Sequence, residues 1–360
     1  MNSNDEAVQE RELLLSLANQ VVSNRKRPML VLFYPGDLGI DERQIELLHT
    51  VLTSNQLSRE HPLQELDVFI HTVGGEPTAA YRLAQVIRDF TRELVFLVPR
   101  YAYSGGTLIC LAGDAIMLGA YAVLSPIDIT LHRSPVYGKR DEQFRFLDEE
   151  EEETEIQLVA IDHFIKVATQ ARIDIENEFR RRKWEMAKSD VENAMLCEMV
   201  RELGVIEIAK LYREKNITQE YARELLKSYM FKDQPLDEHD MNSILRRLVV
   251  EAPAHEFPMD YHICHDVGLK VEEMSDGLSD QCSYLLKQME TMVLNGSICD
   301  KIDEDSRLPF YQYFPYNEAT EDGSQEGTAS VSKESENGST RMFSDEAVFG
   351  RPASGAKISD

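Results

Sequence analysis

Apolar and polar positions follow two patterns along the first third of the chain. Residues 29–34, 66–72 and 95–98 are predominantly apolar, which is typical of short strands buried on both faces of a parallel sheet. Segments 41–52, 77–90 and 107–112 carry apolar residues at helical spacing or are apolar enough for buried helices. Because strands and helices alternate, we expect an α/β fold with a mostly parallel sheet. The pattern leaves the strand order open.

Helical spacing also marks the N-terminal segment 6–23, so we predict an amphipathic helix that packs on the domain or on a neighbouring subunit. Helical character returns over 156–188, 192–229 and 237–248 and predicts a helical layer. The acidic run 148–155 is typical of a solvated loop or of a frayed helix start. Five aromatic residues gather in 309–316, a patch that we expect to dock on the body. The composition of 317–340 is typical of disorder.

These changes divide the chain into four predicted parts. Residues 1–27 form the N-terminal helix, and 28–140 form the α/β core. Residues 141–300 form the helical layer with its acidic insertion, and 301–360 hold the aromatic patch and a disordered tail.

The junction around Ser104 carries the first candidate chemistry. Ser104 lies between the 95–98 strand and the 107–112 helix, where unpaired N–H groups and the helix dipole would stabilise an oxyanion or a deprotonated hydroxyl. Gly105 and Gly106 lack side chains that would block a substrate carbonyl from those N–H groups. Serine also favours the first position before a helix, so a purely structural capping role for Ser104 stays open.

A second glycine turn follows the preceding predicted strand. Gly74 and Gly75 end the 66–72 strand and precede the 77–90 helix. In an open parallel sheet, both turns lie at the carboxyl ends of their strands, where α/β proteins bind ligands. Two such turns side by side could each supply one N–H to an oxyanion hole, with a nucleophile between them.

This order of motifs resembles the Clp protease and crotonase superfamily. It rests on the Gly74-Gly75 turn, on Ala102-Tyr103-Ser104-Gly105-Gly106-Thr107, and on the segments 114–119 and 124–128. Within that superfamily the chain is similar to the serine dehydrogenase proteinase family, which is related to signal peptide peptidase A, also through His255-Glu-Phe-Pro-Met259 and the segment 265–271. The resemblance covers 28–271. Ser125 stands where the family usually has glycine, and an acidic insertion follows Gly138.

The resemblance implies a Clp/crotonase-like parallel sheet of repeated ββα-type units, an added helical layer and a disordered acidic C-terminal tail. It also implies a serine peptidase in which Ser104 attacks the scissile carbonyl and the N–H groups of Gly75 and Gly105 hold the oxyanion. An extended peptide or unfolded protein substrate would lie beside the glycine turn as an added strand. We further expect a homo-oligomer, a trimer or a hexamer of stacked trimers, and no cofactor.

The residue that accepts the Ser104 proton is open, because a neutral serine needs a base within hydrogen-bond reach. Lys166 lies in a segment that resembles the one from which signal peptide peptidase A and its archaeal relatives supply a lysine. His132 lies roughly where Clp proteases place their histidine. We place Lys166 first, His132 second and Lys139 third, although Lys166 also suits an exposed helix pair with Asp162. Asp128 could orient a base or anchor its turn.

Net charge and cysteine content indicate which classes of partner are disfavoured and in which cellular compartment we expect the protein. The net charge of −26 disfavours nucleic acid and anionic lipid as partners. Five cysteines without CxxC spacing argue for reduced thiols and therefore for a cytoplasmic protein. The N-terminus lacks the pattern of a signal peptide. The apolar stretch 105–124 contains Asp114, which fits a buried helix and strand better than a membrane span.

Two other functions stay open. A crotonase-like acyl-CoA enzyme would use the same pair of N–H groups to stabilise an enolate, although no carboxylate lies at the glycine turns beyond Glu76. A catalytically inactive oligomeric scaffold would not need a base. His255, His262 and His265 surround Cys264, but their spacing matches no recognised set of metal ligands, so we expect no metal.

Overall fold

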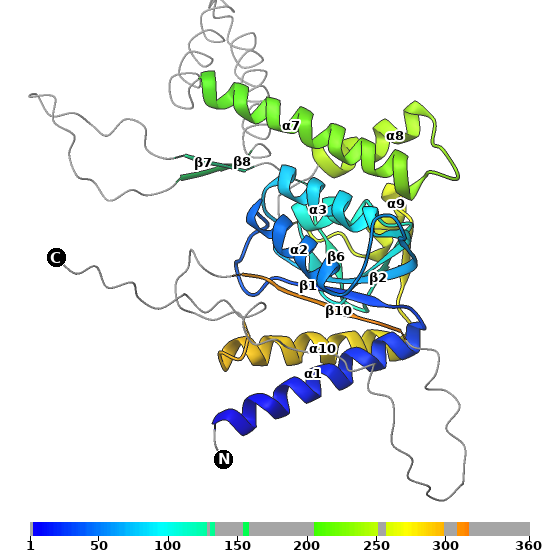
Figure 1. The fold of residues 1–360 in the computed structure, drawn as a ribbon. Helices are drawn as coiled ribbons and strands as arrows, with labels where there is room; N and C mark the ends of the chain where they lie inside the picture. Colours follow the sequence, from blue (N-terminus) through cyan, green and yellow to red (C-terminus); the bar gives the residue numbers. More distant parts are fainter. Residues whose placement is uncertain are drawn as a thin grey trace, which may run out of the picture.

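A computed structural model describes the chain over residues 3–127, 130–133, 154–157, 205–250, 257–298 and 308–316. Side chains are described over 7–127, 212–249, 257–298 and 308–316. This part of the chain forms three layers, with a sheet between two groups of helices (Figure 1). The α/β prediction is confirmed.

The central sheet has six strands in the order β10-β1-β2-β3-β5-β9. Five strands run parallel, and only β10 is antiparallel to its neighbour β1. The parallel strands are β1 (Met29–Phe33), β2 (Leu63–His71), β3 (Thr91–Val98), β5 (Ala115–Leu118) and β9 (Val271–Glu273), and the antiparallel strand is β10 (Phe310–Phe314). Two-stranded ladders add β4 (Tyr101–Ala102) with β6 (Val123–Leu124), and β7 (Thr130–Arg133) with β8 (Thr154–Gln157).

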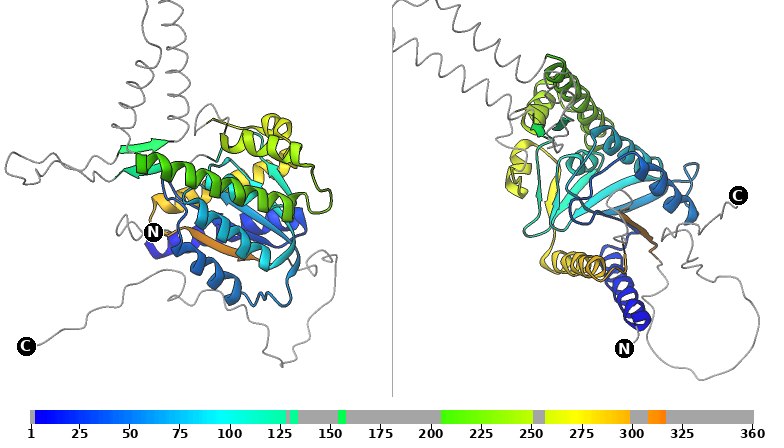
Figure 2. Two further views of the ribbon diagram at one scale, coloured as in Figure 1. Left: turned by 90° about the horizontal axis from the view of Figure 1, so that it is seen from above. Right: turned by 90° about the vertical axis from the view of Figure 1, so that its left-hand side faces the viewer.

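One face of the sheet is covered by helices that come from both halves of the chain (Figure 2). Its core includes Leu32, Ile70 and Phe96, which alternate along their strands with residues of the opposite face. The helices on this side are α2 (Arg43–Ser54), α3 (Pro77–Asp89), α4 (Gly105–Cys110), α7 (Val205–Leu225), α8 (Glu238–Leu245) and α9 (Tyr261–Val267), with π-helical turns at Leu226–Met230 and Arg246–Val250. α7 docks on α3 through a stacked ring pair, Tyr81 and Tyr221.

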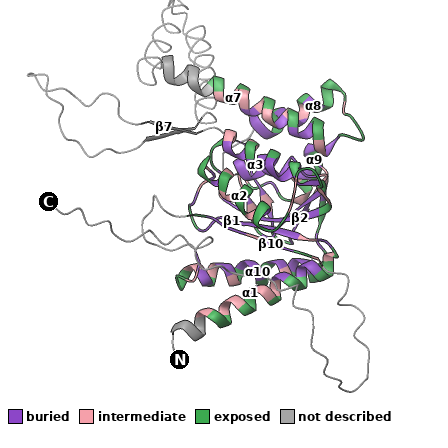
Figure 3. Ribbon diagram, in the orientation of Figure 1, coloured by how far each residue is buried: buried purple, intermediate pink, exposed green. Residues whose placement is uncertain are grey.

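The other face is covered by two helices, α1 (Ser3–Arg25) and α10 (Asp276–Leu294), which lie side by side (Figures 1 and 2). Leu14, Val21 and Leu285 join the core there, and Gln288 of α10 donates a hydrogen bond to the carbonyl of Glu10. The segment predicted as the N-terminal helix is helical over Ser3–Arg25 and packs on the domain. Residues on its outward side are exposed (Figure 3). Within the described ranges, no helix has both the length and the apolar character needed to cross a bilayer.

The sheet reaches beyond the α/β core predicted for residues 28–140, because β9 and β10 come from later in the chain. β9 has only three residues, too few to show a period of two. β10 lies in the aromatic patch, which packs on the body: Tyr311 is buried, and its hydroxyl hydrogen-bonds to the hydroxyl of Tyr34.

Candidate active site

Ser104 lies at a sharp turn between β4 and α4 and has an unusual backbone conformation. Its φ is 47° and its ψ is −109°, a region that side-chain-bearing residues rarely adopt. Ser104 occupies the N-cap position of α4, but its side chain accepts no capping hydrogen bond from the helix. The capping role that serine often has therefore does not explain this residue. The helix itself is six residues long, so its dipole contributes little.

The glycine turn after β2 lies directly against Ser104. Gly74 and Gly75 have φ values of 100° and 147°, which favour glycine. A Cβ atom added to Gly74 would fall 2.6 Å from the Tyr103 carbonyl oxygen and 2.9 Å from the Ser104 Cβ. A Cβ added to Gly105 would fall 3.2 Å from the Gly75 nitrogen. The two predicted glycine turns are therefore in contact, as the parallel sheet led us to expect.

Two backbone donors meet at this contact. Within the described part of the chain, neither the Gly75 N–H nor the Gly105 N–H has a hydrogen-bond acceptor. The neighbouring amides are paired, since Gly74 N donates to Thr72 Oγ1 at 3.0 Å and Gly106 N donates to the Tyr103 carbonyl at 2.7 Å. Two unpaired donors beside one serine are the arrangement that an oxyanion requires.

A buried set of hydroxyl groups holds the Ser104 turn from behind. The Ser104 N–H donates to Ser125 Oγ at 2.8 Å. The Ser125 N–H donates to Thr107 Oγ1 at 3.2 Å, and Thr107 Oγ1 lies 2.8 Å from the carbonyl oxygens of Ala102 and Ser125. Ser125 and Thr107 are fully buried. The sequence showed Ser125 only as a departure from a family glycine, and no spacing signal indicated its contact with Ser104.

A row of aromatic rings leads from the core to the residue before Ser104. His71, at the end of β2, stacks on Phe33 and contacts Tyr101 with ring centroids 4.1 Å apart. Tyr101 stacks in turn on Tyr103 at 4.6 Å. Burial, with a smaller contribution from the charge of Arg100, lowers the pKa of His71 to about 3. His71 is therefore a neutral packing residue at ordinary pH, which the sequence did not reveal.

The predicted bases lie mostly outside the described residues. This applies to Lys166 and Lys139, and also to Asp128, which could orient a base or anchor its turn. The backbone of His132 is described and lies in β7, where it pairs with Glu155 of β8, but its side chain lies outside the described ranges. The choice of base therefore stays a prediction.

The described part of the downstream motif, from Phe257 on, contacts the segment that holds the Ser104 turn. Met259 pairs with Leu124, the residue before Ser125, through two backbone hydrogen bonds of 2.9 Å. Cys264 is buried, its thiol donates to the Met259 carbonyl at 3.4 Å, and burial raises its pKa to about 12. Gly268 ends α9 with a φ of 103° before β9 joins the sheet. His255 lies outside the described residues.

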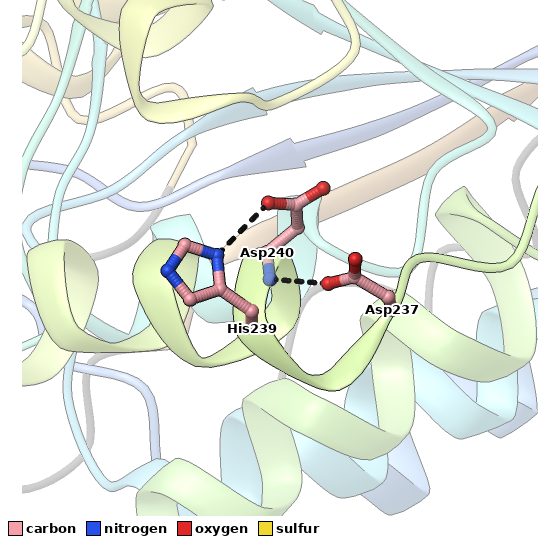
Figure 4. A group of neighbouring side chains, drawn as sticks. All are labelled: Asp237, His239 and Asp240. Carbon is pink, nitrogen blue, oxygen red and sulfur yellow. Dashed lines mark hydrogen bonds and ion pairs between the residues drawn. The ribbon is translucent and has the colours of Figure 1, made fainter.

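One cluster of possible metal ligands, Asp237, His239 and Asp240, lies far along the chain from these turns, at the start of α8 (Figure 4). Asp237 accepts a hydrogen bond from the Asp240 N–H at 2.8 Å, and His239 lies 3.3 Å from the Asp240 carboxylate. All three residues are exposed. Asp237 thus caps the helix, and the cluster has a structural explanation.

Part of the chain is similar to known protein sequences. Residues 44–173 match the family described as ClpP-like SDH-type serine proteinases. Uncharacterized protein MJ0137 of Methanocaldococcus jannaschii is 44% identical over 70 residues, which is 19% of this chain and 24% of that protein. Uncharacterized protein MJ1495 of the same organism is 32% identical over 80 residues, which is 22% of this chain and 27% of that protein.

The chain thus spans about a quarter of the length of each of these two relatives. The family match includes both glycine turns and Ser104 and ends before the downstream motif at 255–271, for which the resemblance stays a prediction. Over residues 44–173, this chain is similar to the ClpP-like SDH-type serine proteinases.

Proposed function

We propose that this chain is a serine peptidase that cleaves extended peptides or unfolded protein segments with Ser104 as its nucleophile. The observation that carries the proposal is the contact between the two glycine turns, where two N–H groups without an acceptor among the described residues lie beside a serine with a φ of 47°. The family match supports a serine peptidase in general terms. The residue roles below are part of our proposal.

In the first step, Ser104 Oγ attacks the carbonyl carbon of the scissile peptide bond, and the carbonyl electrons move to its oxygen. The Gly75 and Gly105 N–H groups donate to that oxygen as its negative charge develops, a contribution of about 10²- to 10³-fold in rate per donor. The base takes the Ser104 proton and passes it to the leaving amine. A water molecule then attacks the acyl-enzyme, so the second product leaves as an acid and Ser104 is restored.

We propose Lys166 as the base and His132 as the alternative. A lysine can accept a proton near neutral pH only where burial lowers its pKa, so Lys166 needs cover from its own segment or from another subunit. This requirement links the base to the proposed homo-oligomer, a trimer or hexamer, which light scattering on the purified chain would measure. If another subunit supplies the cover, a dissociated subunit will lack peptidase activity, whereas cover from its own segment would leave it active.

Labelling with a fluorophosphonate probe tests the nucleophile. We expect wild type to gain one adduct by intact mass and Ser104→Ala to gain none. Ser54→Ala, which removes an exposed serine at the end of α2, is the matched control and should label like wild type. Of Lys166→Ala and His132→Ala, the variant that also loses the adduct identifies the base. A folded, oligomeric wild type without an adduct would contradict a peptidase and favour the acyl-CoA or scaffold alternatives.

A further inference from the structure

We propose that Ser125 is a positioning residue that holds the backbone of Ser104 at its positive φ and so directs the nucleophile toward the two N–H donors. This inference rests on the peptidase function proposed above and adds a residue to it. Ser125 follows β6 and is fully buried, so it contacts no substrate. Its influence on catalysis would pass through Ser104.

The hydrogen bonds around Ser125 fix the direction in which its hydroxyl acts. Ser125 Oγ donates its single hydrogen to the Pro126 carbonyl at 3.0 Å and accepts the Ser104 N–H at 2.8 Å. Because the hydrogen is used on the Pro126 side, a lone pair faces Ser104. The hydroxyl is therefore an acceptor for the Ser104 amide, and it has no free proton to exchange with the reaction.

The Ser104 amide needs the Ser125 hydroxyl as its acceptor, because the turn places this amide outside the backbone hydrogen bonds of a strand or helix. The preceding Tyr103 N–H donates to the Thr72 carbonyl, whereas the Ser104 N–H is bound to a side chain. Ser104 is buried, and an unpaired buried N–H is unfavourable. Losing Ser125 Oγ would thus favour conformations in which this amide turns toward another acceptor, and the direction of the Ser104 side chain would change with it.

Ser125 can serve this purpose because it is itself anchored on two sides. Its N–H and carbonyl both bond to Thr107 Oγ1, one turn into α4. Leu124, the preceding residue, pairs with Met259 through two hydrogen bonds. The acceptor therefore keeps its place independently of Ser104, and the restraint on Ser104 comes from outside its own turn.

Ser125→Ala in the full-length chain tests the inference. We expect kcat toward a fluorogenic peptide to fall about tenfold, since a buried N–H loses its acceptor. KM should stay within about twofold of the wild-type value, because no substrate contact is changed. The midpoints of the pH profile should stay within a few tenths of a pH unit, because the base is not changed. Hydrogen exchange of the Ser104 amide, resolved by fragmentation, should become faster.

Ser279→Ala is the matched control, because Ser279 Oγ also accepts a backbone amide, that of Ala120 at 3.0 Å, at a site away from the turn. Ser279→Ala should keep the wild-type kcat although it loses about as much folding stability as Ser125→Ala. If Ser125→Ala does not fold, Ser125→Cys retains most of the volume with a weaker acceptor and should show the same fall in kcat.

The failures of the two proposals are distinguishable. If wild type takes the fluorophosphonate label and Ser125→Ala or Ser125→Cys keeps wild-type kcat, the positioning role of Ser125 is wrong and the peptidase stands. An equal fall in Ser279→Ala would overturn it as well, since any lost hydrogen bond would then suffice. A wild type that takes no label would overturn both proposals.

Discussion

Replacing Ser104 with glycine should leave a more stable folded chain than replacing it with alanine, and both changes remove the proposed nucleophile. The conformation at φ 47° and ψ −109° costs a residue with a side chain about 1–3 kcal/mol. Glycine adopts it readily, but gives the unfolded chain more freedom, at a cost of about 0.5–1 kcal/mol. The net result is a free energy of unfolding about 1 kcal/mol higher for Ser104→Gly than for Ser104→Ala. Both variants lack the hydroxyl, so the comparison isolates the Cβ atom.

Equilibrium urea unfolding followed by circular dichroism measures this difference. The matched pair is Ser279→Gly and Ser279→Ala at the end of the first turn of α10, where glycine should be less stable than alanine by up to about 1 kcal/mol. The sign of the difference should therefore reverse between the two positions. If glycine is the less stable variant at position 104 as well, the backbone of Ser104 is not strained, and the argument for a held nucleophile is refuted.

Three further predictions concern the surroundings of the site. Burial lowers the pKa of His71 from 6.5 to about 3, so the unfolded chain gains a proton below pH 6.5 that the folded chain does not, and stability is lost as pH falls from 6.5 toward 3. This loss amounts to about 2 kcal/mol at pH 5, and His71→Gln should abolish it. Urea unfolding of wild type and of His71→Gln at pH 7.5 and 5.0 measures the difference, and an equal loss in the two proteins would contradict the prediction. Gly75→Ala should lower the free energy of unfolding, measured by thermal unfolding, by about 3 kcal/mol or more, because the added Cβ would lie 2.2 Å from the Ile40 nitrogen at a φ of 147°. Gly39→Ala is the control and should lower it by less than about 1 kcal/mol, because its Cβ would lie 3.6 Å from the nearest atom. Burial alone would raise the pKa of Asp114, but Lys232, the Leu94 amide and Arg88 together lower it, so its contribution is present above pH 3.8 and lost below that value. Asp114→Asn leaves Arg88 buried without its carboxylate and should cost about 3 kcal/mol at pH 7 and less at pH 3; a pH-independent cost would show that the ion pair contributes nothing.

Patterns within short stretches of sequence predicted the strands, helices and turns whose formation depends mainly on their own residues. Apolar runs identified β1, β2 and β3, and helical spacing identified α2 and α3, because each of these elements buries enough apolar surface to leave a periodic signal. The glycine pairs at 74–75 and 105–106 marked two turns, and the rule that strand ends gather at one edge of a parallel sheet brought them together.

Other features depend on contacts that no local pattern contains. The acceptor role of Ser125 depends on the side-chain direction of a residue 21 positions beyond Ser104. The neutral state of His71 depends on rings from β1 and β4. The base could not be chosen because Lys166 suits an exposed helix as well as a buried site, and only the assembled surroundings distinguish these two states.

The pairing of β10 with β1 has a consequence for synthesis and for handling of the chain. Tyr34 and Tyr311 are 277 positions apart, so the ribosome completes almost the whole described chain before the edge of β1 finds its partner. Until then, the apolar residues Met29–Phe33 present an open strand edge that can pair with another nascent chain. Any C-terminal truncation that removes Phe310–Phe314 makes this exposure permanent. Shortened versions meant for crystallisation should therefore end after Tyr316, and those cut upstream of Phe310 should accumulate as aggregates.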